Sequence, residues 1–243
     1  MKDAEDDFCK RMRKATRQVH AISDALVNAK LALGLSDNQV WADGLLVFYE
    51  IFKFMEEAMF RLKDSPVGLM YVKGLERTEA FEKDLEYYLG KDWKKTYQSR
   101  KSVTDYLKKL QEVERSDSIL LIAYIYHLYM GLLSGGMILR KKMILKNNLF
   151  GSSNFQNGYN ITEFEGTTVH QLKTHLRFTI NKIVSVLSEE KKEELIKESK
   201  TVFELNNKII KSIKIPYDAI IKSVPVIVFV VALMIVIMLQ ILR

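Results

Sequence analysis

The chain has 243 residues, of which 48% are hydrophobic and 28% are charged, so its composition is that of a globular protein with one sizeable core. A single cysteine, Cys9, excludes a disulfide framework and a cysteine-based zinc or iron–sulfur site. The net charge of +7 comes from interspersed basic and acidic residues without a nucleic-acid recognition motif, so we expect no nucleic acid and favour an anionic ligand or membrane surface as the partner.

Residues 1–214 are predicted to form one all-α domain. Apolar residues recur at three- and four-residue spacing, as in Leu172, Leu176, Ile180 and Ile183, and no stretch alternates with period two for long enough to predict a sheet. Breakers such as Ser65-Pro66 separate the periodic segments. The pattern predicts helices over residues 5–31, 37–63, 78–89, 101–112, 116–146, 167–187 and 190–213. Ser188 is expected to cap the last of them.

The first predicted helix carries a histidine and a carboxylate four residues apart, His20 and Asp24. Residues at this spacing share one helix face. A carboxylate that accepts the proton of one imidazole nitrogen leaves the other nitrogen free to bind a metal. The alternative is an ordinary structural histidine, which is the more frequent case for a lone His.

The predicted helix over residues 116–146 contains three glycines within six residues: Gly131, Gly135 and Gly136. Each glycine in a helix interior costs about 1 kcal/mol relative to alanine, so the cluster needs a reason. One reason is close helix–helix packing. The other, which we favour, is a bent helix whose bare backbone lies against a flat ligand.

Two basic pairs recur at helical spacing, Arg13 with Arg17 and Lys173 with Arg177. Like charges four residues apart repel each other, unless both are solvated or an anion lies between them. Solvation is the ordinary explanation. Taken together, the four cations could instead hold two carboxylates at the edge of a flat apolar ligand.

Residues 225–242 form an apolar run in which Gln240 is the one polar residue. A helix of about 18 residues is ~27 Å long, close to the ~30 Å hydrocarbon core of a bilayer. Lysines precede this run and only Arg243 follows it, so the positive-inside bias predicts a cytosolic body. We therefore expect a transmembrane tail anchor at residues 225–242, joined to the body by a short tether at residues 215–224. The alternative is a buried core helix.

Several segments, taken in order, resemble the heme oxygenase family of the membrane-anchored, eukaryotic type. They are KATRQVH at residues 14–20, LERTEAFEKDLEYYLGKDW at 75–93, YxxYxGxxSGG from Tyr126, LKTHLRFTIN at 172–181 and SKTVFELN at 199–206. The resemblance covers nearly all of residues 10–212. It implies a single all-α heme oxygenase-like domain that holds heme between a proximal helix and a kinked, glycine-containing distal helix.

The resemblance also implies roles for individual residues. His20 would be the axial ligand of the heme iron and Asp24 its orienting partner, where the family commonly has Glu. Gly131, Ser134, Gly135 and Gly136 would line the distal face, with Tyr126 in the pocket. The heme propionates would meet four cations: Arg13, Arg17, Lys173 and Arg177.

One departure from the family pattern concerns chemistry. The family's distal helix reads Gly-Asp-x-Ser-Gly-Gly, and this chain has Leu132 in place of the aspartate that anchors a proton-delivering water network. A leucine side chain neither donates nor accepts a hydrogen bond. By the same resemblance, Leu128 stands where a basic residue is expected and Phe52 aligns with an expected tyrosine. The whole network would then be apolar.

The leading interpretation is a heme oxygenase that cleaves heme b to biliverdin, carbon monoxide and ferrous iron. By the family's pattern it would use O2 and electrons from NADPH through NADPH–cytochrome P450 reductase. The second is a heme-binding pseudo-enzyme that senses, stores or carries heme. The third is a tail-anchored helical adaptor without heme. We expect the endoplasmic reticulum membrane, with the body on its cytosolic face, while the outer mitochondrial membrane is the alternative.

Overall fold

The computed structural model of the chain describes residues 7–34, 38–149, 158–217, 221 and 238. Every regular element in this part of the chain is a helix, as the apolar periodicity predicts. The α-helices are α1 (Phe8–Ala15), α2 (Arg17–Gly34), α3 (Asn38–Arg61), α4 (Thr78–Leu89), α5 (Trp93–Thr96), α6 (Lys101–Asp117), α7 (Leu121–Gly131), α8 (Met137–Leu149), α9 (Val169–Val184) and α10 (Glu189–Ser212). A π-helix, η3 (Leu132–Gly136), joins α7 to α8, and short 3-10 turns are η1 (Gly68–Met70), η2 (Ser118–Leu120) and η4 (Asn160–Thr162).

Two of the helices begin at side-chain caps. At the start of α9, Thr168 and Gln171 form a reciprocal capping box, in which the Thr168 hydroxyl accepts from the Gln171 backbone N–H at 3.2 Å. At the start of α10, the Ser188 hydroxyl accepts from the Lys191 backbone N–H at 3.3 Å, which confirms the predicted cap. These caps fix the first turns of the two helices that cross the centre of the molecule.

The predicted continuous helix over residues 5–31 is wrong at one point, because the helix is interrupted at Thr16. Thr16 is buried, and its hydroxyl donates to the Met12 carbonyl at 2.8 Å. Threonine that bonds back to its own helix bends the helix axis. Arg13 therefore lies at the end of α1 and Arg17 at the start of α2, instead of on one straight helix.

The predicted helix over residues 116–146 is likewise divided, into η2, α7, the π-helix η3 and α8. The π-helix coincides with the segment Leu-Leu-Ser-Gly-Gly, so the break falls within the glycine cluster. Such single-turn π segments inside α-helices are rare and occur often at functional sites. At the position where the glycine cluster predicts a bent helix, the structure has a change from α-helix to π-helix. The short helix α5 was not predicted, and α6 extends five residues beyond its predicted end, to Asp117.

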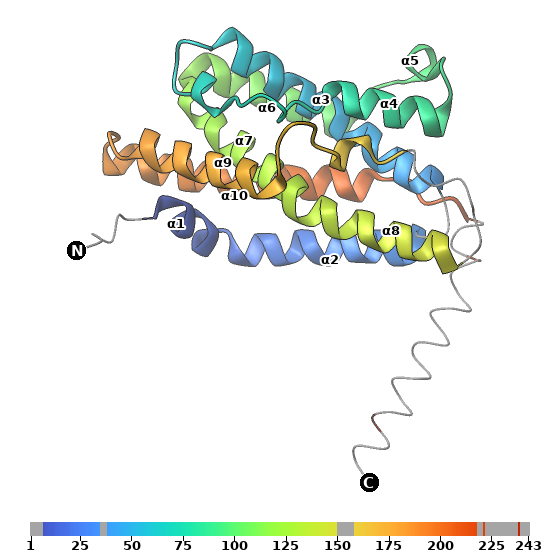
Figure 1. Cartoon of the computed structure of the whole chain (residues 1–243). Helices are drawn as coiled ribbons and strands as arrows, with labels where there is room; N and C mark the ends of the chain where they lie inside the picture. The colour runs from blue at the N-terminus through green and yellow to red at the C-terminus, as the bar shows by residue number, and fades with distance from the viewer. Residues whose placement is uncertain (1–6, 35–37, 150–157, 218–220, 222–237, 239–243) are drawn as a thin grey trace.

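Helix α10 lies at the centre of the arrangement and packs against α2, α7, α6 and α1. In Figure 1 it runs with α9 through the middle of the molecule, with α3, α4 and α6 on one side and α1, α2 and α8 on the other. A continuous core of buried side chains joins α3, α4, α6, α7, α9 and α10. Burial of this apolar surface is the main source of stability, at roughly 25 cal/mol per Å².

Cationic side chains hold the C-terminal end of α10. The Lys30 ammonium donates to the Ile213 carbonyl at 2.6 Å, and Arg100 donates to the Ser212 carbonyl at 2.7 Å. Asp43 pairs with Arg100 and also accepts from the Lys214 backbone N–H at 2.6 Å. Cations at a helix C-terminus satisfy its last carbonyls and oppose the helix dipole. We call this set of contacts the exit clamp.

The predicted tail anchor at residues 225–242 lies, apart from Met238, outside the described residues. Within the described part, one helical run, Lys101–Leu145, is long and apolar enough to cross a bilayer. Half of its most apolar window is buried inside the fold, and buried core helices pass the same test of length and composition.

Candidate functional site

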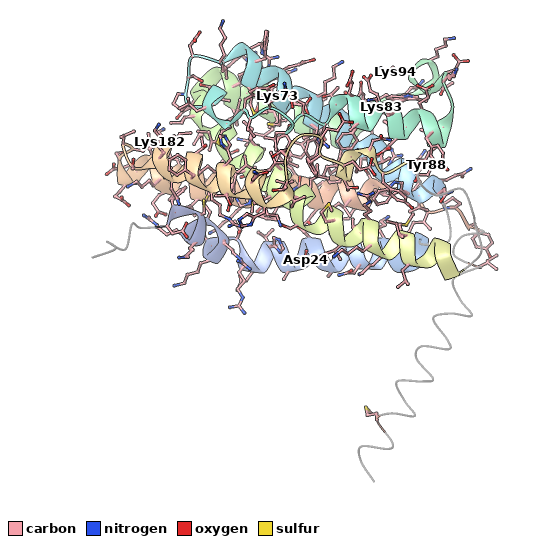
Figure 2. The ribbon with its side chains drawn as sticks, in the orientation of Figure 1. Asp24, Lys73, Lys83, Tyr88, Lys94 and Lys182 are labelled. Carbon is pink, nitrogen blue, oxygen red and sulfur yellow. The ribbon has the colours of Figure 1, made fainter. Side chains whose placement is uncertain are left out.

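His20 lies on α2 with a little over half of its side chain exposed (54%). Its Nδ1 is 3.0 Å from a carboxylate oxygen of Asp24, which Figure 2 labels on the same helix. The contact is direct, so Asp24 holds Nδ1 as the donor and leaves Nε2 as the nitrogen free for a ligand. The described residues contain no group of three or more side chains that could hold a bare metal ion. His20 therefore suits a metal ion whose other ligands belong to a bound molecule and not to the protein.

A line of aromatic rings connects α2 to α7 across α10. The His20 ring meets the Phe203 ring edge-on, with 5.1 Å between centroids. The same Phe203 ring also meets the His127 ring at 4.9 Å, and His127 meets Tyr126 at 5.1 Å. Phe203 of α10 thus contacts two imidazoles, that of His20 from α2 and that of His127 from α7.

Two of the three glycines present bare backbone to open space. Gly131 and Gly135 are exposed, and a Cβ atom added at either would meet no other atom within 4 Å. Close helix–helix packing, the alternative reading of the cluster, is therefore excluded at these two positions, because nothing is packed there. Ser134, between them, is exposed as well.

The glycine segment lies between two connections to α2. The ring line through His127 connects α7 to α2 before the glycines, and after them Lys142 of α8 donates to Asn28 of α2 at 3.3 Å. Between these two bridges, α2 packs on α1, α3 and α10 and makes no extensive contact with α7, η3 or α8. We call this space, bounded by His20, Phe203, Gly131 and Gly135, the glycine slot.

Gly136 has a different role from the other two glycines. A Cβ atom there would lie 2.9 Å from the Leu132 side chain and 3.7 Å from that of Thr162. The missing side chain makes room for Leu132, which packs partly buried against the core. Leu128 and Phe52 are buried too, and Phe52 meets Tyr129 edge-on at 5.1 Å. All three positions, at which the resemblance led us to expect polar groups, thus belong to the apolar core or pack against it.

The basic residues gather where α1 meets α9. The Asn181 amide donates to Asp7 at 3.3 Å, and the Cys9 thiol lies 3.9 Å from the Arg177 carbonyl, so the two helices run antiparallel. In this register Arg13, one turn after Cys9, lies level with Lys173, one turn before Arg177. Partial burial and the charge of Arg177 lower the pKa of Lys173.

No salt bridge within the described residues involves the four cations of this edge, which are Arg13, Arg17, Lys173 and Arg177. Other surface cations of the molecule are paired, as Arg11 is with Glu189 and Glu193. The unpaired edge is therefore suited to an anionic group such as a carboxylate.

Tyr126 lies beneath this basic edge, almost fully buried. Burial, followed by the neighbouring Cys9, raises the pKa of its phenol well above the usual range. Burial likewise raises the pKa of the Cys9 thiol to about 11, so the thiol stays protonated and inert. The Tyr126 ring contacts the His127 ring, and it is His127 that contacts Phe203.

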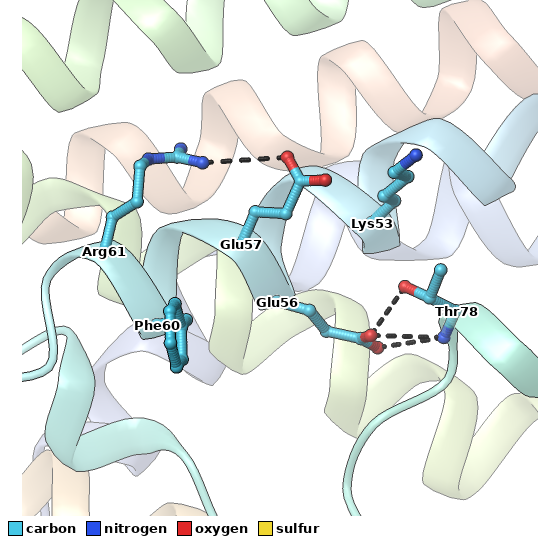
Figure 3. A pocket seen from close by; sticks show the side chains of 6 residues that line it. All are labelled: Lys53, Glu56, Glu57, Phe60, Arg61 and Thr78. Carbon is cyan, nitrogen blue, oxygen red and sulfur yellow. Dashed lines mark hydrogen bonds and ion pairs between the residues drawn. The ribbon is translucent and has the colours of Figure 1, made fainter.

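Two further hollows lie elsewhere. One, of about 400 Å³, is lined by Lys53, Glu56, Glu57, Phe60, Arg61 and Thr78. Figure 3 shows that Glu56 turns toward Thr78 there, where it accepts from both the backbone and the hydroxyl. The Glu56 carboxylate thus connects α3 to the first residue of α4, and its role in this hollow is structural. The second, of about 380 Å³, lies along α9 from His170 to Phe178.

Two members of the site were not assigned from the sequence. Phe203 stands in one of the segments that carry the resemblance, but nothing in its spacing marks it as the floor of a slot. The pairing of Ser23 with Asn207, at 2.6 Å, locks α2 onto α10 and was equally invisible, because the two residues are far apart in the chain.

Comparison with known proteins identifies a family and several relatives of this chain. A family model described as heme oxygenase matches residues 6–212. Heme oxygenase 1 from Homo sapiens is 33% identical over 141 residues, which cover 56% of this chain and 48% of that protein. The match thus spans about half the length of this relative.

Solved structures are similar over more of the chain. Heme oxygenase 2 from Chlamydomonas reinhardtii, solved without heme, has a TM-score of 0.78 and 27% identity and covers 87% of this chain and 100% of its own. Heme oxygenase-2 from Synechocystis, solved in complex with heme and NO, has a TM-score of 0.76 and 25% identity, and covers 85% of each chain.

Proposed function

Because this chain belongs to the heme oxygenase family, we propose that it binds heme b in the glycine slot and cleaves it to biliverdin, carbon monoxide and ferrous iron. Bound heme would supply the iron that reacts with O2 and the ring that is opened. Electrons would come from NADPH through NADPH–cytochrome P450 reductase. The observation that carries the proposal is the combination of a His20 imidazole held by Asp24 with open backbone at Gly131 and Gly135.

The residues of the slot fit a flat macrocycle with two carboxylates. His20 would bind the iron through Nε2, with Asp24 holding the ring in one tautomer. Gly131 and Gly135 leave room for a planar group to lie against the helix. The unpaired cations on α1, α2 and α9 would bind the propionates and so set the orientation of the ring.

Proton delivery would have to use groups other than a distal carboxylate. Leu132, Leu128 and Phe52 offer no polar atom beyond the backbone. The Ser134 hydroxyl is exposed in the π-helix, next to Gly135. It is the nearest side-chain group in this segment that can hold water at the slot.

The experiment is a single turnover of the full chain in detergent, loaded with one equivalent of heme. Reductase, NADPH, air and catalase are then added. Loss of the Soret band with a biliverdin band and carbon monoxide release supports the proposal. Loss of colour without pigment or carbon monoxide, or a stable Soret band, contradicts it.

The ligand assignment has a separate test. His20→Ala should abolish the Soret shift that heme shows on binding, whereas His170→Ala, an exposed histidine on α9, should not. Tight binding of His20→Ala with an unchanged spectrum would contradict the assignment.

The second candidate function, a heme-binding pseudo-enzyme, is favoured by the apolar packing around Leu132. Such a protein would sense, store or carry heme. It would bind heme with 1:1 stoichiometry and form no bile pigment in the turnover experiment.

We also propose that residues 225–242 anchor the protein in the endoplasmic reticulum membrane with the body in the cytosol. The support is the apolar run and the lysines before it. In microsomes, the body should be digested by protease added from outside, and a glycosylation tag appended after Arg243 should become modified. A protected body or an unmodified tag would contradict this topology.

A further inference from the structure

Helix α2 carries His20, and it packs most extensively on α10. The His20 ring meets Phe203 of α10 edge-on at 5.1 Å. Its Nδ1 is held by Asp24, which belongs to the same helix and so moves with it. The position of the free Nε2 in the glycine slot therefore depends on how α2 is seated on α10.

One turn beyond the ring contact, two buried polar side chains meet. Ser23 lies three residues after His20 on α2. Asn207 lies four residues after Phe203 on α10. Both residues are buried, and the Ser23 hydroxyl donates to Asn207 Oδ1 at 2.6 Å. This hydrogen bond is thus the polar neighbour of the contact between the two rings.

The two helices run in parallel, and a third contact continues the same register. The Lys30 ammonium of α2 donates to the Ile213 carbonyl at the end of α10, at 2.6 Å. Ring contacts and apolar packing tolerate small rotations of a helix, whereas a hydrogen bond weakens steeply when its angle changes. Near His20, the bond between Ser23 and Asn207 is therefore the contact that fixes how far α2 is rotated and shifted along α10.

Ser23 also has a possible partner within its own helix. Its Oγ lies 3.2 Å from the Val19 carbonyl, one turn earlier. A serine that bonds back in this way bends its helix, and the turn from Val19 to Ser23 is the one that contains His20. A hydroxyl has one proton to donate, so Asn207, the nearer acceptor, competes with Val19 for it.

We propose that Ser23 and Asn207 are positioning residues for the heme ligand: their hydrogen bond sets the place and the angle at which the His20 imidazole meets the iron of heme bound in the glycine slot. This inference rests on the proposed binding of heme at His20. The two residues act through α2, so replacing either one alters the bond between iron and histidine without removing it.

The test is resonance Raman spectroscopy of the ferrous iron–histidine stretching band, on the full chain in detergent with one equivalent of heme. Ser23→Ala leaves Asn207 Oδ1 buried without its donor. We expect the band to shift and broaden. Heme loss to a scavenger protein should become about two- to tenfold faster, the range that corresponds to one hydrogen bond. Ser23→Thr keeps the hydroxyl and should restore the wild-type band.

Asn207→Leu separates positioning from stability. Leucine is apolar and of similar size, and the Ser23 hydroxyl can then donate to the Val19 carbonyl instead. No buried polar side chain of this pair loses its last partner, so the melting temperature should stay close to that of the wild type. The iron–histidine band should nevertheless change, because the turn that contains His20 has gained the back bond and lost its link to α10.

Tyr106→Phe is the matched control. The Tyr106 hydroxyl donates to Asn206 Oδ1 at 3.1 Å, so it joins α6 to the same turn of α10 without involving α2. Its removal should lower the melting temperature and leave the iron–histidine band unchanged.

The outcomes separate this proposal from the proposed function. A wild-type band in Asn207→Leu, or an equal change of the band in Tyr106→Phe, overturns the positioning role and leaves heme binding at His20 intact. If Ser23→Ala does not fold, Asn207→Leu still decides the question. A wild type that binds no heme, or that shows no iron–histidine band, overturns both proposals.

Discussion

At the scale of single residues, Leu132 is the position at which the resemblance led us to expect an aspartate. It packs against the space left by Gly136 and lies close to Thr162. A carboxylate placed there would be partly buried, at a cost of roughly 1–3 kcal/mol by mutational measure. It would also restore a group that can order water at the π-helix. Activity and stability should therefore change in opposite directions at this residue.

We expect Leu132→Asp to gain biliverdin formation in single turnover relative to the wild type while losing thermal stability. Leu132→Asn is the matched control, because it has the same size without the charge. The measurement is the rate of biliverdin appearance, with melting temperature recorded alongside. Equal rates for the Asp and Asn variants would show that a missing carboxylate does not limit the reaction.

Single residues also show what the sequence can and cannot predict. The pairing of His20 with Asp24 follows from their spacing on one helix, so it could be predicted locally. The contact of His127 with Phe203 could not, because Phe203 comes from a helix far along the chain. Contacts between distant segments need the packed fold, and periodicity says nothing about them.

At the scale of elements, the π-helix η3 shapes the slot. Most helix bounds follow from apolar periodicity and breakers, and α4 begins and ends where predicted. The division of α1 from α2 at Thr16, and of α7 from α8 at η3, could not be read from periodicity. Both breaks are small changes in hydrogen bonding within a pattern that remains helical, and both lie beside the slot.

Filling the slot from the helix should separate binding from stability. Gly135→Leu adds a side chain where there is open space and replaces a poor helix former. We expect unfolding to be unchanged or more difficult by up to about 1 kcal/mol, and heme affinity to fall at least about tenfold. Chemical denaturation and heme titration measure the two effects.

Lys141→Leu, on an exposed part of α8, is the control for added apolar surface. It should leave heme affinity unchanged. If Gly135→Leu binds heme as tightly as the wild type, the ligand does not lie against this glycine.

An ion pair on α4 predicts how stability depends on pH. Burial acts to raise the pKa of Glu82, but contacts with Lys94 at 2.7 Å and with the Tyr49 hydroxyl at 2.6 Å outweigh it and lower the pKa. A lowered carboxylate pKa stabilises the fold above the unfolded value of about 4.5, and this contribution disappears as the pH falls below it. Glu82→Gln should cost about 0.2–1 kcal/mol at pH 7 and less at pH 3.

Urea unfolding at the two pH values is the measurement. Glu79→Gln, an exposed residue one turn earlier on the same helix, should cost less at pH 7. A Glu82→Gln deficit of the same size at both pH values would rule out the linkage.

At the scale of the whole molecule, unpaired cations from α1 and α9 lie where these two helices pack, and Arg17 follows at the start of α2. The four positions could be chosen from the sequence as two like-charged pairs. Their meeting depends on the antiparallel register of α1 and α9, which Asp7, Cys9 and their partners fix. The all-α architecture was predictable from periodicity alone, whereas this convergence required the fold.

We expect Lys173→Glu to weaken heme binding by about fivefold at low salt and by less at high salt, because an exposed charge is screened. Lys101→Glu, an exposed lysine at the start of α6, should have no such effect. Heme titrations at two ionic strengths give the comparison. A Lys173→Glu effect that does not depend on salt would point to altered packing instead of propionate binding.

The exit clamp determines the direction in which the chain leaves the body. Lys30 from α2, Asp43 from α3 and Arg100 beside α6 all grip the backbone between Ser212 and Lys214. Helix α10 also carries Phe203, so the ring at the slot and the end of the helix at Ser212 belong to the same rigid element. A fluorescent label at Tyr217 would therefore lie at a fixed distance from heme bound in the slot. The distribution of energy-transfer efficiency between this label and heme should be narrow in the wild type. It should broaden when Arg100 and Lys30 are both replaced by alanine.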